Sequence, residues 1–253
     1  MNYSEIAKEA RLKVLDLIYK AQTSHIGSNF SCIDILTVLF EKIDLEKDEF
    51  VLSAGWKAAS LYYFLWKKGY ITEEELDSYC QEGSKFIGLA EPIIPQIKIA
   101  GGSMGLGLPG AVGLALAKKL KGEEGNVYVL MSDGEMQIGT TWESALIAFQ
   151  HKLDNLVVVV DNNGLQAMGK TKDILDGYFP ARDWKNTVVD GHDYGAIEAR
   201  LDGKFFNGDG YPSVIFAATV KGKGVSFMEN NNLYHYKQLS GEEYNKAKEE
   251  LNG

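Results

Sequence analysis

Two groups of polar residues could together hold a metal ion, Ser132-Asp133-Gly134 and Asp161-Asn162-Asn163-Gly164. Each group follows directly after a run of apolar residues. The carboxylate of Asp133 and the side-chain carbonyl of Asn163 are hard oxygen ligands, and the turn that follows can direct the main-chain carbonyl of Leu165 to the same point. This set of oxygens suits Mg²⁺ or Ca²⁺.

The number of oxygens indicates what else the metal would bind. Magnesium keeps a nearly octahedral geometry and often completes it with phosphate oxygens and water, so two or three protein oxygens predict a metal-bridged diphosphate. An Asp-Gly pair after a strand is by itself commonly only a turn. Here Asn163 follows Asp133 by 30 residues, and the pairing of the two groups favours a binding site.

A parallel sheet would bring the two groups together. Buried strands are expected at 50–52, 127–131, 156–160 and 214–218, with a weaker candidate at 188–189. Helical segments between these strands predict an α/β fold with a doubly wound, mostly parallel sheet and helices on both faces. Ligands of such sheets bind beyond the carboxyl ends of the strands. We therefore expect both polar groups at one edge of the sheet.

Helices are indicated by apolar spacing and by capping residues. The first spans Ile6 to Ala21, and Ser24-His25-Ile26-Gly27 closes it, which places His25 in a turn. Ser31 with Asp34 predicts a capping box that opens a helix through Phe40, and Thr72 with Glu75 predicts another. Further helices are expected at 106–121, where Gly122 ends the helix, around 141–149, and, as a short acidic helix, around 242–251.

Composition limits the class of protein. The chain has 253 residues, 45% of them apolar and 24% charged, as in a globular protein with a substantial core. We find no repeat or linker and expect one domain over residues 1–253. No apolar run is long enough for a membrane span or a signal peptide, so we expect a soluble, cytoplasmic protein. The net charge of -9 argues against nucleic acid as a partner.

With these residues in view, the sequence resembles the thiamine diphosphate signature, Gly-Asp-Gly followed about 30 residues later by Asn-Asn or Asp-Asn; Ser132 replaces the first Gly. From the first helix to about Tyr244, the chain also resembles the N-terminal, diphosphate-binding subunit of split transketolases. Matching stretches include Thr219 to Phe227 and Tyr234-His235, which falls where the family has Trp-His-Gly. The resemblance implies the thiamine diphosphate-binding fold.

The resemblance also implies a set of cofactor-binding residues. The segment Gly102-Ser103-Met104-Gly105-Leu106-Gly107 is similar to the loop that cradles the cofactor's aminopyrimidine in the family. The implied residues are Trp56, Gly102, Ser103, Met104, Asp133, Gly134, Asn163 and His235, with Asp133, Asn163 and Leu165 on the metal.

Two of the four histidines fall on family positions that contact the substrate. These are His25, in a segment similar to the family's Gly-His-Pro-Gly turn, and His235, which also approaches the diphosphate in the family. We expect pKa values near neutral for this pair, because the reaction moves protons on and off sugar hydroxyls. Structural roles are favoured for His151 and His192.

Three positions depart from the family. The Lys-Gly-His-Ala-Ala turn reads Ala54-Gly55-Trp56-Lys57-Ala58, so Trp56 replaces a histidine. Leu89 replaces a second active-site histidine, and Ile138 replaces a glutamate that helps couple the two cofactor sites in the family. Apolar groups in place of imidazoles discriminate against a ligand whose polar groups would stay unpaired. We expect a less hydroxylated donor or an unusual acceptor.

The resemblance implies a transketolase-like enzyme that moves a two-carbon ketol, or a related unit, from a ketose-type donor to an aldehyde. It implies thiamine diphosphate and Mg²⁺ as cofactors. It also implies a C-terminal, pyrimidine-binding partner subunit that supplies the catalytic Glu, in an α2β2 heterotetramer that alone is active. Two alternatives stay open. One is the α-subunit of a 2-oxo acid dehydrogenase, against which the Thr219 to Phe227 stretch and His235 argue; the other is a catalytically lapsed scaffold or regulatory subunit.

Overall fold

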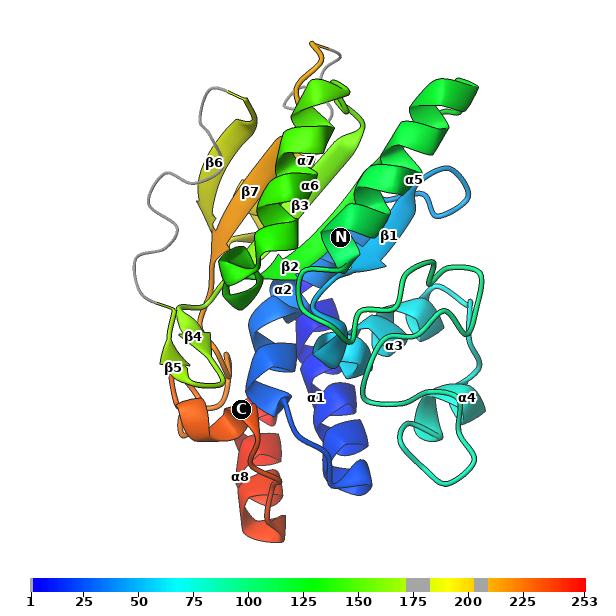
Figure 1. The fold of residues 1–253 in the computed structure, drawn as a ribbon. Coiled ribbons are helices and arrows are strands. Elements are labelled where there is room, and N and C mark those ends of the chain that lie inside the picture. Colours follow the sequence, from blue (N-terminus) through cyan, green and yellow to red (C-terminus); the bar gives the residue numbers. More distant parts are fainter. Residues whose placement is uncertain (1, 172–182, 203–208) are drawn as a thin grey trace.

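A five-stranded parallel sheet forms the centre of the molecule (Figure 1). The computed structural model describes residues 2–171, 183–202 and 209–253. In sheet order, the strands are β1 (Glu49–Leu52), β2 (Val127–Ser132), β3 (Leu156–Asn162), β7 (Ser213–Ala218) and β6 (Lys185–Asp190). All the expected strands form, including the weaker candidate. Strand β3 is buried from Leu156 to Asp161, as its unbroken apolar run predicts.

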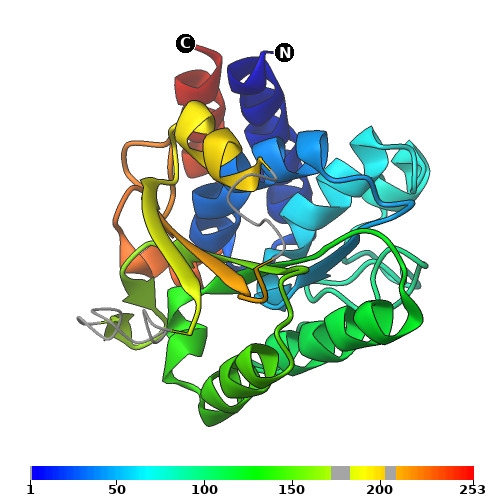
Figure 2. The same ribbon diagram turned by 90° about the horizontal axis from the view of Figure 1, so that it is seen from above.

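Helices cover both faces of the sheet, as expected (Figure 2). One face carries α5 (Gly107–Lys121) and α6 (Gly139–Gln150); the other carries α1 (Tyr3–Ala21), α2 (Ile26–Lys42) and α7 (Tyr194–Leu201). Side chains of a strand point alternately to the two faces. Leu130 and Val159 therefore join the core beneath α1 and α2, while Val129 and Val158 join the core beneath α5 and α6.

The remaining elements are short, and several surround the carboxyl edge of the sheet. They are α3 (Ala58–Lys67), α4 (Glu73–Asp77), α8 (Gly241–Asn252), the hairpin of β4 (Leu165–Gln166) with β5 (Gly169–Lys170), and 3₁₀ helices η1 (Gly55–Lys57), η2 (Asp133–Gln137) and η3 (Asn232–His235). The capping box of Thr72 and Glu75 is confirmed, and Gly122 ends α5 with a φ of 68°. None of the described helices is long and apolar enough to cross a membrane.

The expected helix start at Ser31 is wrong. Helix α2 begins at Ile26, and Ser31 and Asp34 lie inside it, fully or almost fully buried. Their side chains bind segments that are distant in the sequence. The Ser31 hydroxyl donates to Asp161, and Asp34 accepts two hydrogen bonds from Arg11, at 3.0 and 2.6 Å. Ser31 and Asp34 thus have the spacing of a capping box, but their side chains bind Asp161 and Arg11 instead of capping a helix.

Candidate functional site

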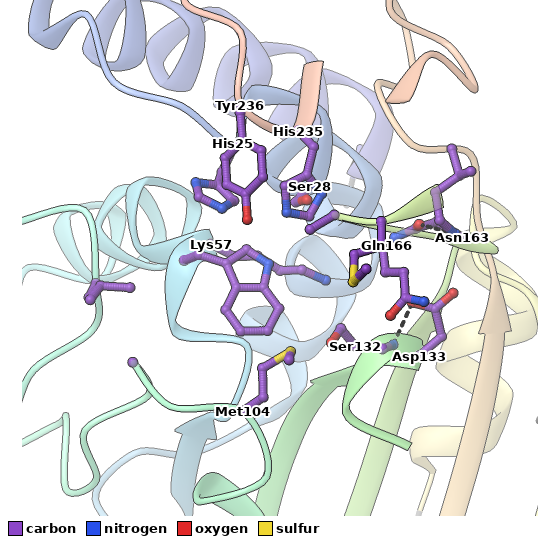
Figure 3. A pocket seen from close by; sticks show the side chains of 17 residues that line it. His25, Ser28, Lys57, Met104, Ser132, Asp133, Asn163, Gln166, His235 and Tyr236 are labelled. Atoms are coloured by element: carbon purple, nitrogen blue, oxygen red, sulfur yellow. Dashed lines mark hydrogen bonds between the residues drawn. The ribbon is translucent and has the colours of Figure 1, made fainter. Parts of the chain in front are cut away.

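A cavity of about 410 Å³ opens where the carboxyl ends of the strands meet helix α2 and η3 (Figure 3). This volume lies within the range of small-molecule sites. Among the residues that line it are the predicted His25, Trp56, Gly102, Met104, Asp133, Gly134, Asn163, Leu165 and His235. Ser103 is exposed and does not line the cavity. We call the part around Asp133 and Asn163 the metal end, and the part around His25 and His235 the histidine end.

At the metal end, Asp133 joins the two polar turns. Its Oδ2 accepts hydrogen bonds from the Gly164 N–H at 2.7 Å and the Thr171 hydroxyl at 2.9 Å, and its Oδ1 accepts one from the Gly134 N–H at 2.9 Å. Asn163 follows the neighbouring strand, and its Oδ1 accepts from the Leu165 N–H at 3.1 Å. The sheet therefore brings Asp133, Asn163 and Leu165 to one side of the same cavity.

The charge of Asp133 supports a cation at this end. Burial, together with the charge of Asp161, raises the pKa of Asp133 to about 6. Within the described ranges, no Lys, Arg or His side chain lies within ion-pair distance of it. A buried carboxylate without a counter-charge fits a divalent metal. The described residues hold no cluster of three His, Cys, Asp or Glu, so the donors here would be one carboxylate with amide and carbonyl oxygens, which suits Mg²⁺.

Beneath the metal end lies an ion pair that sequence reasoning missed. The Lys57 ammonium donates to Asp161, and both side chains are almost completely buried. The hydroxyls of Ser31 and Thr219 also donate to Asp161. Burial opposes both charges, but the Lys57 ammonium lowers the pKa of Asp161, and Asp161 in turn raises the pKa of Lys57. The only available signal was a lysine among small and apolar residues just after a buried strand.

Lys221 is a second buried lysine, and it lies against His235. Its Nζ is 2.6 Å from His235 Nδ1, and in the described parts of the chain no carboxylate lies within ion-pair distance of it. Burial, helped by the charge of Lys57, lowers the pKa of Lys221 to about 8. A buried cation without a carboxylate partner fits an anionic ligand nearby, such as a diphosphate. The Thr219 to Phe227 stretch was the signal for this residue.

Glu135 fixes the glycine loop beside the cavity. This carboxyl is fully buried and accepts hydrogen bonds from the Ser53 hydroxyl, the Gly105 N–H at 3.2 Å and the Ser132 N–H at 2.9 Å. Gly105 has a φ of 78°, and a Cβ there would lie 2.4 Å from Ile138 Cγ2. A side chain is therefore excluded at Gly105 by both conformation and space.

At the histidine end, His25 and His235 are joined through the backbone. The His25 N–H donates to the His235 carbonyl at 2.9 Å, and the ring centroids are 5.0 Å apart. His25 precedes α2 with a φ of 69°, which is uncommon for a residue other than glycine and recurs at functional sites. Its Nδ1 is 2.7 Å from the Ser24 hydroxyl. The turn predicted around His25 thus delivers the ring to the cavity.

The expectation of near-neutral pKa values for this pair is wrong. Burial and the charge of Lys221 lower the pKa of His25 to about 4 and that of His235 to about 3. Both rings are therefore neutral at pH 7. Because an ammonium can only donate, His235 Nδ1 accepts from Lys221, and Nε2 carries the proton. His235 is thus a hydrogen-bond donor through Nε2.

The three departures occupy different places. Trp56 and Leu89 line the cavity, and the Trp56 ring centroid is 6.5 Å from that of His25. Ile138 does not line the cavity; it packs against Gly105, behind the glycine loop. The two replaced histidines therefore leave apolar groups on the cavity wall, while the replaced glutamate becomes part of the support of the loop.

Comparisons with known proteins identify the class. Residues 3–252 match the family model described as transketolase, thiamine diphosphate binding domain, so the chain belongs to the transketolase family and is its thiamine diphosphate-binding part. The solved transketolase of Campylobacter jejuni matches with a TM-score of 0.90 at 29% identity, over 100% of this chain and 43% of that one. The chain therefore spans less than half the length of that transketolase.

Within this family, the chain corresponds in extent to one subunit of a split enzyme. It is 36% identical to a subunit of the apulose-4-phosphate transketolase of Actinobacillus succinogenes, over 99% of this chain and 97% of the relative. It is 32% identical to the 6-deoxy-6-sulfo-D-fructose transketolase subunit SqwG of a Clostridium species, over 97% and 94%. Because both relatives are subunits by name, a partner subunit is implied. These matches favour a transketolase over the α-subunit of a 2-oxo acid dehydrogenase.

Proposed function

We propose that residues 1–253 act as one diphosphate-binding domain and form one of the two kinds of subunit in a split, cytoplasmic transketolase with an unusual sugar donor. The observation that carries the proposal is the buried Asp133 carboxylate, which has no cationic partner among the described residues and faces a cavity beside Asn163 and the glycine loop. A divalent metal with a diphosphate would balance the charges of Asp133 and the nearby Lys221.

The residues divide the work as follows. Asp133 and Asn163 would hold Mg²⁺ through side-chain oxygens, and Leu165 would do so through its main-chain carbonyl. The cofactor would contact Trp56, Gly102, Ser103, Met104, Gly134 and His235. When bound, thiamine diphosphate supplies the carbanion and the electron sink for breaking and forming the carbon–carbon bond.

His25 and His235 serve the substrate. Both are neutral at pH 7, so His235 donates from Nε2 to a donor or acceptor oxygen, and His25 is available as a hydrogen-bond partner. Their distance from each other, 5.0 Å between ring centroids, allows both to contact one sugar.

The donor is a ketose-type sugar with fewer hydroxyls to satisfy than the common ketose phosphates. Leu89 has no hydrogen-bonding side chain and Trp56 has only an indole N–H donor, so a sugar hydroxyl that faces them finds no side-chain acceptor in exchange for water. The relatives named for apulose 4-phosphate and 6-deoxy-6-sulfo-D-fructose support an unusual sugar as the donor.

A pyrimidine-binding partner subunit completes the site and supplies the Glu that activates the cofactor, in an α2β2 assembly. Apolar side chains at the glycine loop and the β4–β5 hairpin support a covered surface here: Met104, Leu106 and Met168 are 44%, 50% and 96% exposed. This chain alone therefore binds the cofactor weakly and does not turn over.

The experiment compares this chain alone with the copurified complex. Titration with thiamine diphosphate and Mg²⁺ by calorimetry should give weak binding for the chain and tight binding for the complex, and only the complex should consume a ketose donor. Complete absence of cofactor binding by both would instead support a lapsed scaffold. Robust ketol transfer by this chain, free of any partner, would refute the split enzyme.

A further inference from the structure

Tyr236 stands at the histidine end and has no role in the site described so far. It follows η3 directly, is 61% exposed and lines the cavity. Its ring centroid lies 4.6 Å from that of His235 and 5.4 Å from that of His25. Figure 3 shows its ring next to His25 and His235, with the hydroxyl directed into the cavity.

Hydrogen bonds hold the backbone that leads into Tyr236. The Tyr236 N–H donates to the Leu233 carbonyl at 3.3 Å, and the His235 carbonyl accepts from the His25 N–H at 2.9 Å. One residue before His235, the Tyr234 hydroxyl donates to Glu243 at 2.7 Å. The backbone at Tyr236 is therefore fixed next to the two histidines, and the ring lies against both of them.

The Tyr236 hydroxyl is free to bind a ligand. In the described part of the chain it makes no hydrogen bond, although the nearby Tyr234 hydroxyl has one. A phenol both donates and accepts, so it can bind a sugar hydroxyl in either direction. Of the two neutral rings beside it, His235 donates from Nε2, whereas His25 can donate or accept according to its tautomer.

Tyr236 also changes the shape of the cavity. It stands where the Trp-His-Gly stretch that the sequence resembles has glycine, so a large ring occupies space that glycine leaves empty. Trp56 and Leu89, which stand in place of histidines, line the same cavity. Two imidazoles are thus absent from the wall, and one phenol is added close to the reacting groups.

We propose that Tyr236 is a specificity-determining residue of the transketolase reaction. Its hydroxyl binds a hydroxyl of the sugar donor next to His25 and His235, and its ring limits the cavity to compact donors. Long, extended ketoses such as sedoheptulose 7-phosphate are disfavoured. The inference rests on the proposed function, because it assumes that a ketose donor enters at the histidine end.

The test uses the complex of this chain with its partner and four donors: apulose 4-phosphate, 6-deoxy-6-sulfo-D-fructose, xylulose 5-phosphate and sedoheptulose 7-phosphate. Tyr236→Phe should keep the melting temperature and the affinity for thiamine diphosphate with Mg²⁺. It should lower kcat/KM for the preferred donor by about 10-fold, the loss expected for one hydrogen bond. Tyr236→Gly should raise kcat/KM for sedoheptulose 7-phosphate relative to the preferred donor by about 10-fold.

Tyr211→Phe is the matched control, because Tyr211 is also exposed, at 40%, but does not line the cavity. This variant should behave as the wild type. The inference is overturned if Tyr236→Phe stays within twofold of the wild type on the preferred donor, or if its loss follows a parallel loss of cofactor affinity. In both cases an active, cofactor-binding wild type leaves the proposed function intact. A wild-type complex that consumes none of the four donors overturns both.

Discussion

At the metal end of the cavity the wall comes from the carboxyl ends of β2 and β3, whereas at the histidine end it comes from the residue before α2 and from η3. The metal end is charged and supported by the buried Lys57–Asp161 pair; the histidine end is aromatic and partly open. The Asp, the following Gly and the Asn of the family's signature are kept at the first, and Trp56, which replaces a family histidine, lies near the second. Regular strands thus hold the part that binds a constant cofactor, and short irregular segments hold the part that can vary with the substrate.

The largest effect should come from breaking the ion pair beneath the metal end. Lys57→Met leaves Asp161 buried without its counter-charge and should lower the free energy of unfolding by about 3–5 kcal/mol. Urea denaturation of the chain measures this. Adding Asp161→Asn should restore part of the loss. Lys42→Met, which removes an exposed ion pair, should lower the free energy of unfolding far less, because water and salt screen that pair. If Lys57→Met and Lys42→Met lower the free energy of unfolding equally, the buried pair beneath the metal end has no special role in stability.

The next effect concerns the metal itself. Asp133→Ala should remove Mg²⁺-dependent binding of thiamine diphosphate while circular dichroism shows a retained fold. A loss of at least about 3 kcal/mol, or more than 100-fold in affinity, is expected because a charged oxygen ligand disappears. Calorimetry with and without Mg²⁺ gives the value. Asp202→Ala, at an exposed position, is the control. Affinity unchanged from the wild type would remove Asp133 from the metal site.

Acid should lower the stability of the protein by protonating Asp34, whose contacts link α2 to the segment that carries Lys221. Asp34 binds α2 to Arg11 and His192, and His192 Nε2 accepts from the Val220 N–H at 2.8 Å, next to Lys221. Burial raises the pKa of Asp34, but the hydrogen bond from His192 and the charge of Arg11 outweigh it and lower the pKa to about 2. Because the pKa of Asp34 is lower in the folded state than in the unfolded state, its stabilisation is fully present above the ordinary pKa. The stabilisation is lost as the pH falls from there through the folded-state pKa.

The stability curve therefore has a predictable shape. Between about pH 4 and pH 2 the wild type should lose about 2 kcal/mol of unfolding free energy to the protonation of Asp34. Asp34→Asn should start from a lower stability and show a shallower slope over this window, measured by denaturation at each pH. Asp77→Asn, at a half-exposed position, should leave the slope unchanged. If Asp34→Asn does not alter the slope, Asp34 is not the group whose protonation destabilises the protein in this window.

The smallest effect should be a change of preference rather than a loss. Trp56→His with Leu89→His restores two imidazoles and should raise turnover of xylulose 5-phosphate relative to apulose 4-phosphate by about 10-fold in the complex. Cofactor affinity should change less than the donor ratio. If the ratio does not move, these two apolar side chains do not determine the donor, and the histidine end owes its specificity to other groups.

Periodicity and strand-end motifs predicted the architecture, because apolar runs such as 156–160 can be satisfied only by burial on both faces. The same reasoning could not find the start of α2. Ser31 and Asp34 have the spacing of a capping box, but Asp161 and Arg11 bind them from distant segments. Local patterns cannot reveal such partners.

The sequence predicted the site residues that come directly after a strand, such as Asp133 and Asn163. It did not predict the residues whose charge depends on burial. The sequence alone assigned Lys57 and Lys221 no role of their own, because only the fold shows that they are buried against Asp161 and His235. The near-neutral pKa expected for His25 and His235 follows from the residue type alone. Burial lowers the pKa of both rings, so that expectation fails. A side chain's surroundings, rather than its type, set its charge.

The hydrogen bond from the His25 N–H to the His235 carbonyl joins the beginning of the chain to a segment close to its end. Contacts between such remote residues form late, since a long loop must close before they give any gain. During synthesis, the metal end can form as soon as β3 has joined β2, but the histidine pair must wait until η3 has been made. A newly made chain therefore passes through a stage at which Asp133 and Asn163 could accept a metal, while Lys221 and His235 are not yet in place to bind a diphosphate or a sugar.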